Sequence, residues 1–339
     1  MTSERTQSVK LGLMLSNRGP VLGYASAREL VELGVRAEES GFFDSVWSGD
    51  AFLVNPRLDA INLLSAVAAR THRVMLGPAC MGSFTQRGAL DLAYSWASLD
   101  QLAGGRSVMV ACVGGGSPQS WARESGAAGI STLNRREVMW ERVALLRKLW
   151  QDDNVTFKGA YHQVDGVTIE PKPLRSPYPI WAATNITRLS SGTAEGKLPT
   201  KTLATVGTLC DGWMTHSVTP DRFSEAWARI EAAAANAGKD PAALDNCLCM
   251  NVCVHEDAQA ALDESVTFLK AYYGIEFTRE RTRAWTLHGP PTAIAEGLAA
   301  LNDSAVKRVA LRITANDQSA QLERLIGEVL PLLPQHGSR

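Results

Sequence analysis

The sequence predicts a single α/β domain over residues 1–339, a (β/α)8 TIM barrel in which eight parallel strands alternate with helices. Short apolar runs and helical patterns alternate along nearly the whole chain, and no linker rich in proline or serine divides it. Alternation of this kind produces right-handed crossovers and a parallel sheet, and eight units fit a closed barrel better than an open sheet. The 339 residues exceed the roughly 250 of a typical barrel, so insertions are expected.

Eight apolar runs are predicted to form the barrel strands, because each is short and ends at a loop signal. They occupy residues 9–15, 44–48, 74–80, 107–113, 179–184, 212–215, 246–254 and 308–313. The fourth run (SVMVACV) is apolar without interruption, which is typical of a strand buried on both faces.

Helices are predicted between the strands, where apolar residues recur at helical spacing. The first begins at a capping box, since Ser26 is followed three residues later by Glu29. The expected helices are 27–37, 58–71, 89–102, 135–150, 200–209, 220–237, 257–272, 292–301 and 319–333. Insertions follow strands four, five and seven: a hairpin at 155–173 that turns at Asp165 and Gly166, and loops at 186–199 and 273–289.

Composition and charge exclude several classes of protein. Apolar residues make up 45% of the chain and charged residues 20%, as in a globular protein, and a net charge of -1 argues against nucleic-acid binding. The first residues (MTSERTQSVK) lack the apolar stretch of a secretory signal, and the longest apolar runs are about half of a membrane span. Six cysteines without a short-loop pattern fit free thiols in a reducing compartment. We therefore expect a cytoplasmic protein that does not bind membranes.

Barrel chemistry lies in the loops that follow the strands, so residues there are the site candidates. Residues 114–117 (GGGS) follow strand four, but Gln119 stands where a dinucleotide motif needs its third glycine, which favours a tight turn that a ligand can approach. Asp50 ends strand two, where an acid either contacts the ligand or holds a neighbouring residue by a hydrogen bond. Cys112, beside the glycine turn, is a site candidate or a small core residue.

Two histidines and a helix start complete the candidates. His216 and His255 follow strands six and seven on the expected active face, although an ordinary loop histidine is the alternative for each. Thr200 and Lys201 open a helix whose free N–H groups suit a phosphate, or they form a solvated helix start. Asn185 and Arg188, after strand five, could reach the same phosphate.

No metal site is expected from the cysteine and histidine spacing. Cys247, Cys249 and Cys253 have the same parity within one predicted strand, so they share a face and are expected to pack in the core. No Cys-x-x-Cys pair or histidine spacing completes a tetrahedral set.

The segment 73–117 resembles the strand–helix–strand unit of the bacterial luciferase-like flavin monooxygenases and their relatives, the deazaflavin-dependent reductases. It reads RVMLGPACMGSFTQRGALDLAYSWASLDQLAGGRSVMVACVGGGS, and its SLDQLAGGR stretch is highly typical of the family. Four further stretches support the resemblance, which extends from about residue 9 to 334: EESGFFDSVW at 38–47, PIWAATN at 179–185, CDGWMT at 210–215 and HGPPTAIAEGL at 288–298.

The resemblance implies a barrel, usually dimeric, that binds reduced flavin at the C-terminal ends of its strands. In relatives a non-proline cis peptide, here between Ala79 and Cys80, forms a bulge behind the flavin ring. Cys112 corresponds to a cysteine near the flavin of luciferase, and Thr184 and Asn185 match positions that contact flavin and phosphate. The expected catalytic residues are then Asp50, Cys112 and His216. The expected cofactor-binding residues are Ala79, Cys80, Cys112, Gly114, Thr184, Asn185, Arg188, Thr200 and Lys201.

Two positions depart from the family pattern. Many relatives carry a histidine directly after the acid of strand two, where this chain has Ala51, so its role is vacant or has moved to His216. The phosphate-binding arginine of luciferase, at the end of strand four, is Val113 here. Phosphate binding is therefore expected to depend on the residues after strand five.

From this resemblance we expect a monooxygenase that uses reduced FMN and O2 to oxidise a small organic substrate. The chain has no nicotinamide fingerprint, so a separate NAD(P)H:flavin reductase is expected to supply the flavin. The substrate would lie over the ring, beside Trp213 and Trp285. One alternative is a hydride-transfer oxidoreductase that depends on a deazaflavin coenzyme of the F420 type. The other is a non-catalytic flavin-binding protein, since Ala51 stands where a catalytic histidine is common.

Overall fold

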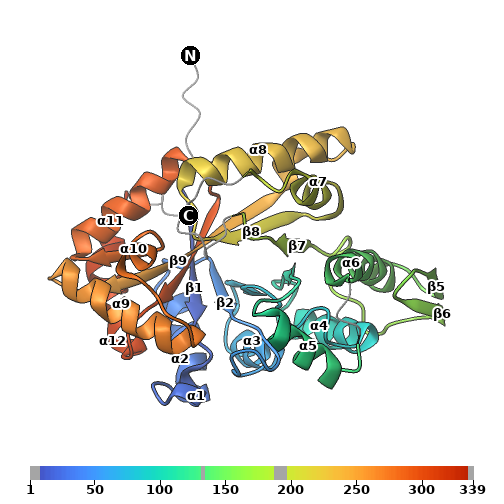
Figure 1. Cartoon of the computed structure of the whole chain (residues 1–339), viewed down its shortest axis with the longest axis horizontal. Helices are drawn as coiled ribbons and strands as arrows, with labels where there is room; N and C mark the ends of the chain where they lie inside the picture. Colours follow the sequence, from blue (N-terminus) through green and yellow to red (C-terminus); the bar gives the residue numbers. More distant parts are fainter. Residues whose placement is uncertain (1–7, 131–133, 187–196, 335–339) are drawn as a thin grey trace.

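The computed structural model describes residues 8–130, 134–186 and 197–334, and it forms the predicted barrel. Helices surround a central ring of parallel strands (Figure 1). The eight barrel strands are β1 (Lys10–Leu15), β2 (Ser45–Ser48), β3 (Met75–Pro78), β4 (Met109–Ala111), β7 (Ile180–Ala183), β8 (Gly212–His216), β9 (Asp245–Val254) and β11 (Arg308–Ile313). Their order around the ring is β3-β2-β1-β11-β9-β8-β7-β4.

The ring closes between β3 and β4 through two isolated bridges rather than a continuous ladder, and we call this junction the β3–β4 seam. The bridges join Leu76 to Ser107 and Met81 to Ala111. In the second bridge, the Met81 N–H donates to the carbonyl oxygen of Val110 at 3.0 Å. The peptide bond between Ala79 and Cys80, which lies between the bridges, is cis, as the resemblance implied.

Nine predicted helices are present, with small differences at their ends. They are α2 (Ala27–Glu39), α3 (Ala60–Ala68), α4 (Ala89–Leu102), α6 (Arg135–Gln151), α7 (Thr200–Leu209), α8 (Pro220–Asn236), α9 (Ala258–Tyr273), α11 (Pro291–Ala299) and α12 (Gln318–Arg324). The capping box at Ser26 and Glu29 is confirmed. The last helix is α-helical only to Arg324 and continues as a π turn (Leu325–Val329) and a 3-10 turn (Leu330–Leu332), and Pro331 in the second turn has no N–H to donate.

Four short elements were not predicted. They are the helices α1 (Gly19–Leu22), α5 (Pro118–Ala127) and α10 (Arg279–Arg283) and the strand β10 (Thr286–Gly289). β10 lies within the predicted insertion 273–289 and pairs with the C-terminal part of β9. The insertion therefore extends the wall of the barrel above its mouth.

The predicted hairpin exists beside α6, at the edge of the molecule, but its turn was placed wrongly (Figure 1). Strands β5 (Val155–Lys158) and β6 (Gln163–Val167) are joined by residues 159–162, whereas Asp165 and Gly166 lie within β6. The carboxylate of Glu141 on α6 accepts hydrogen bonds from three successive backbone N–H groups of this turn, at 2.7–2.8 Å. The acceptor belongs to another element, so local turn signals did not reveal it.

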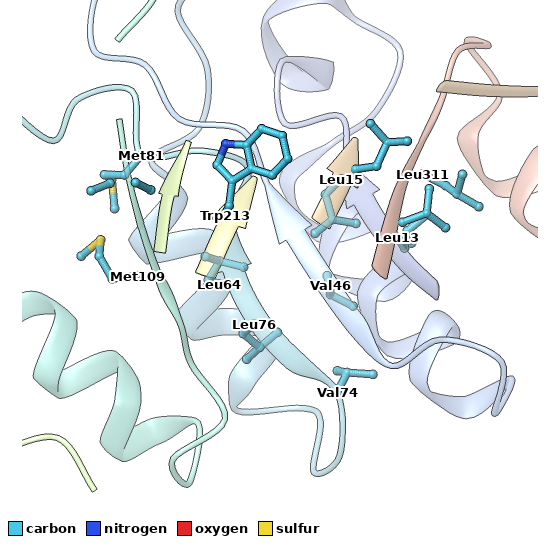
Figure 2. Close-up of a cluster of buried hydrophobic side chains, with 14 of the residues drawn as sticks. Leu13, Leu15, Val46, Leu64, Val74, Leu76, Met81, Met109, Trp213 and Leu311 are labelled. Atoms are coloured by element: carbon cyan, nitrogen blue, oxygen red, sulfur yellow. The ribbon is translucent and has the colours of Figure 1, made fainter. Parts of the chain in front are cut away.

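Side chains alternate along each strand between the barrel interior and the layer that faces the helices. The outer layer is the main core and includes Leu13, Leu15 and Leu76 from the strands and Leu64 from α3 (Figure 2). The interior is filled by a second cluster: Met14, Trp47, Val108, Val110, Trp181, Met214, Cys247, Cys249 and Ala310. Cys253, expected beside the other two cysteines, belongs to the outer layer.

Helices α7 and α8 pack closely at Gly207, which makes this glycine a test of the outer layer. A methyl group there would clash with the backbone carbonyl oxygen of Ile230, and backbone cannot move aside cheaply. Gly207→Ala is expected to lower the free energy of unfolding by about 1–3 kcal/mol in urea denaturation. Gly126→Ala in α5 is the matched control, since its methyl meets no atom within 4 Å. The control should gain up to about 1 kcal/mol, and equal effects would contradict the packing.

Candidate functional site

A cavity of about 640 Å³ lies at the C-terminal ends of the barrel strands. Eight of the predicted site residues line it: Asp50, Ala79, Cys80, Cys112, Gly114, Thr184, Asn185 and His216. Thr200 and Lys201 are exposed and do not line it, whereas Pro199 and Thr202 of the same helix start do. Arg188 lies outside the described residues. The strand ends thus bring most of the predicted set together.

Asp50 is buried at the end of β2, and its carboxylate is engaged by the protein. Its Oδ2 accepts hydrogen bonds from the backbone N–H of Ser83 at 2.7 Å and from the Ser83 hydroxyl at 2.6 Å. Arg87 lies 3.5 Å from Oδ1 and also pairs with Asp59. Burial raises the pKa of Asp50 despite these partners. The geometry favours the positioning alternative, in which Asp50 ties the loop after β3 to the end of β2.

Glu124 is a cavity residue that the sequence reading missed. It lies on α5 and is 3% exposed. One carboxylate oxygen accepts hydrogen bonds from the backbone N–H groups of Leu53 and Val54, at 2.6 and 3.0 Å, and the other from the Gln86 amide at 3.0 Å. Glu124 thereby holds the loop after β2 beside the cavity. Because α5 itself was not predicted, no signal pointed to this residue.

Two thiols and a glycine form the cavity wall at the β3–β4 seam. The Cys80 thiol hydrogen-bonds to Cys112 and lowers the pKa of the Cys112 thiol, which also accepts from the Gly114 N–H at 3.3 Å. Gly114 has a φ of 83°, and a Cβ there would lie 2.7 Å from the carbonyl oxygen of Gly82. The predicted tight turn is therefore present, and it leaves backbone open to the cavity.

His216 ends β8 and faces the cavity. Its Nδ1 lies 2.9 Å from the Ser217 hydroxyl, and its ring packs against that of Trp285, with centroids 4.9 Å apart and planes inclined by 31°. Burial, with Arg312 and Arg281 nearby, lowers the pKa of His216 to about 4. The imidazole is therefore neutral at neutral pH and able to accept a proton.

The two tryptophans that were expected to line the substrate site differ in where their side chains lie. Trp285 lines the cavity as predicted and donates to the carbonyl oxygen of Cys249 at 2.8 Å. Trp213 does not, because its side chain points outward into the helix-facing layer and is fully buried there (Figure 2). Its indole N–H donates to the Thr184 hydroxyl at 2.8 Å, so Trp213 orients a lining residue from behind.

Arg57 and Arg312 also line the cavity, and both were missed. Arg312 lies on β11 in the sequence RVALRI and shares its parity with Ala310 of the barrel interior. A charged residue at an inward position near the C-terminal end of a mostly apolar strand was the signal that could have found it. Arg57 comes from the loop between β2 and α3, where local patterns carry no such signal.

The geometry can be compared with known proteins. A family model described as luciferase-like monooxygenase matches residues 9–308. The chain belongs to this family. An F420-dependent glucose-6-phosphate dehydrogenase of Kineococcus radiotolerans is 26% identical over 346 residues, 92% of this chain and 96% of that protein. One of Amycolatopsis mediterranei is 34% identical over 161 residues, 46% of this chain and 47% of that protein.

Solved structures show the same fold. An F420-dependent secondary alcohol dehydrogenase in complex with an F420-acetone adduct aligns with a TM-score of 0.77 at 19% identity, over 97% of this chain and all of that chain. The monooxygenase RslO1 of Streptomyces bottropensis aligns with a TM-score of 0.75 at 22% identity, over 95% and 99% of the two chains. Both likenesses agree with the TIM barrel predicted for this luciferase-like chain.

The expected cofactor was wrong. Several curated relatives of this luciferase-like chain are named for F420, which contradicts reduced FMN and supports the deazaflavin alternative. The expectations of O2 as a reactant and of a separate flavin reductase were drawn from the FMN assignment, so they have no basis without it. The chain is nevertheless an oxidoreductase by family. Across the described ranges, no helix is long and apolar enough to span a bilayer, and no cluster of acidic, cysteine or histidine side chains could hold a metal.

The lowered pKa of His216 makes stability depend on pH. As the pH falls from 6.5 towards 4, His216 binds a proton in the unfolded chain but not in the folded chain. The free energy of unfolding therefore decreases over this window. Between pH 7.5 and 5.0 this group removes about 2 kcal/mol from the free energy of unfolding. His216→Phe keeps a ring against Trp285 but removes the titrating group. The difference in its free energy of unfolding between pH 7.5 and 5.0, measured with urea, should therefore be smaller than that of the wild type by about 2 kcal/mol. An unchanged difference would contradict the buried neutral state.

Proposed function

We propose that this luciferase-like protein is an F420-dependent oxidoreductase that transfers hydride between the deazaflavin and a small organic substrate. Two observations support the proposal: curated relatives that align over most of the chain are named for F420, and the barrel mouth holds one cavity that joins the β3–β4 seam to a neutral histidine. The cavity's 640 Å³ is within the range of about 300–1,000 Å³ that small-molecule sites occupy.

The residues present fit a planar ring at the seam. Gly114 has no room for a side chain, so the backbone of the seam meets the ring directly. We assign the ring to Ala79, Cys80, Cys112 and Gly114.

Thr184 and Asn185, at the end of β7, would hold the polar chain of the cofactor. Trp213 fixes the Thr184 hydroxyl from behind, which supports this assignment. Thr202 lines the cavity at the start of α7, so it replaces Thr200 and Lys201 as the residue of that helix nearest the ligand. The homodimer expected from the resemblance stays a prediction.

When bound, F420 supplies a ring carbon that accepts or donates hydride. The protein's own part is to move the matching proton and to exclude water. His216 is neutral and lines the cavity, so it is suited to accept the proton of a substrate hydroxyl group when the adjoining carbon loses hydride. Trp285 covers one face of its ring and shields it from solvent.

Cofactor choice is tested by titrating the protein with F420 and with FMN and monitoring binding by tryptophan fluorescence. F420 is expected to bind at least about tenfold more tightly, a difference of about 1.4 kcal/mol. Gly114→Val should weaken F420 binding because its side chain would meet the backbone at Gly82. Gly126→Ala, on α5, is the matched control and should bind as the wild type does. Equal or tighter binding of FMN would contradict the proposal.

Proton transfer is tested by replacing His216. His216→Asn is expected to reduce kcat for F420 reduction, with a panel of small alcohols, by about 100-fold or more, while F420 affinity stays unchanged. His288→Asn is the control, because His288 lies on β10 away from the cavity lining and its Nδ1 is 2.9 Å from the Thr286 carbonyl oxygen. Retained kcat in His216→Asn would remove histidine from the proton path.

A further inference from the structure

Three guanidinium groups surround the ring of Tyr272 near the mouth of the barrel. Arg18, Arg57 and Arg312 lie 5.9, 5.3 and 4.6 Å from its centroid. Tyr272 lies in the last turn of helix α9, whereas the arginines come from β11 and from the loops after β1 and β2. Segments far apart in the sequence therefore concentrate positive charge at one place.

This charge has no acidic partner. Among the residues that the structure describes, no carboxylate forms an ion pair within 4.0 Å of these three groups. Their hydrogen bonds go to backbone carbonyl oxygens, phenol groups and one thioether. The partners are Met14, Asn55, Pro56, Ala271, Tyr272 and Tyr273. Neutral acceptors leave the positive charge of the group uncompensated.

Arg312 is the most deeply buried of the three. It is 4% exposed and lines the cavity, and within the described ranges its buried Nε has no hydrogen-bond partner. A buried cation without a counter-ion lowers stability unless something else compensates it. Replacement by an apolar side chain of similar length would relieve that cost, so the arrangement is more readily explained by binding than by stability.

The position of Arg312 separates it from the proposed cofactor wall. In the ring order, β11 and β9 stand opposite the junction of β3 with β4. Arg312 on β11 thus faces the seam across the cavity, and Arg57 lines the same cavity. His216, one strand beyond β9, lies between the two walls.

The acidic residues of the cavity do not neutralise this wall. Asp50 and Glu124 line it as well, but Asp50 is bound by Ser83 and Glu124 by the loop after β2 and by Gln86. The carboxylates of the cavity are therefore engaged by the protein, whereas Arg312 and Arg57 have no carboxylate within 4.0 Å among the described residues. Such an asymmetry attracts and orients an anion.

We propose that the substrate carries an anionic oxygen group, a carboxylate or a phosphate ester, that binds Arg312 and Arg57. The inference rests on the proposed function only in that it calls the bound anion a substrate. Binding of an anion to Arg312 and Arg57 does not itself require F420. The planar guanidinium fork matches both oxyanions. Trp285, beside His216, offers an aromatic surface for the rest of the molecule. The oxidised carbon would then lie between the basic wall and the seam, within reach of His216.

The test compares probes of similar shape and different charge by isothermal titration calorimetry: benzoate, phenyl phosphate and neutral benzamide. The wild type is expected to bind at least one anion about tenfold or more tighter than benzamide. Arg312→Met and Arg57→Met should reduce this preference about tenfold. Arg312→Lys, which keeps the charge without the fork, should retain part of it. Arg36→Met is the control, because Arg36 pairs with Glu323 on the outer surface. This variant should keep the wild-type preference for the anion over benzamide.

The tighter of the two anions identifies the oxygen group that the wall recognises. Equal binding of benzamide by the wild type, or an intact preference in both methionine variants, overturns the inference. Melting temperatures show that the variants fold: Arg312→Met should melt at or above the wild-type temperature, and the tighter-binding anion should raise the melting temperature less in Arg312→Met than in the wild type or Arg36→Met. If Arg312→Met fails to fold, Arg57→Met and Arg312→Lys decide the outcome.

F420 titration of the same variants separates this inference from the proposed function. Loss of F420 affinity in Arg312→Met with an intact anion preference would assign the basic wall to the cofactor and overturn the inference. Failure of the wild type to bind F420 would overturn the proposed function instead, while the anion preference is still read from the calorimetry.

Discussion

The site depends on how β3 and β4 meet. Seven of the eight junctions between neighbouring barrel strands are regular parallel ladders, whereas these two strands join through two isolated bridges. Where the ladder is interrupted, Ala79, Cys80 and Cys112 border the cavity instead of pairing across the β3–β4 seam. The barrel thus closes without giving up the open backbone surface on which the proposed ring would lie.

The residues around this opening are held by buried acids that face the chain rather than the ligand. Asp50 ties the loop after β3 to β2, and Glu124 ties the loop after β2 to α5. Buried carboxylates with several donors are well satisfied and fix the groups that donate to them. The basic side has the opposite character, because Arg312 retains an unpartnered nitrogen. The cavity thus combines loops that are fixed by engaged carboxylates with two arginines, Arg57 and Arg312, that no described carboxylate pairs with.

Much of the architecture was predictable because it follows from local patterns. All eight barrel strands and nine of the twelve described α-helices were predicted from apolar patterns, and the Ser26–Glu29 capping box was confirmed. Interactions between elements were not predictable in the same way. The hairpin turn depends on hydrogen bonds to Glu141 of α6. Trp213 was expected beside the substrate, but it occupies an outward-facing position on β8. The FMN expectation failed for another reason, since flavin and deazaflavin enzymes share this fold and its bulge.

From the amino-acid order alone came the alternation of strands and helices, the inward and outward faces, and the set of residues at the strand ends. These are properties of neighbours in the chain, where spacing and side-chain type suffice. The tertiary structure decided which of them meet: Arg57, Arg312 and Tyr272 converge although more than 200 residues separate the first from the other two. That convergence depends on strand order and helix packing around a closed ring, because uncompensated charge is a property of a place in space and not of a stretch of sequence.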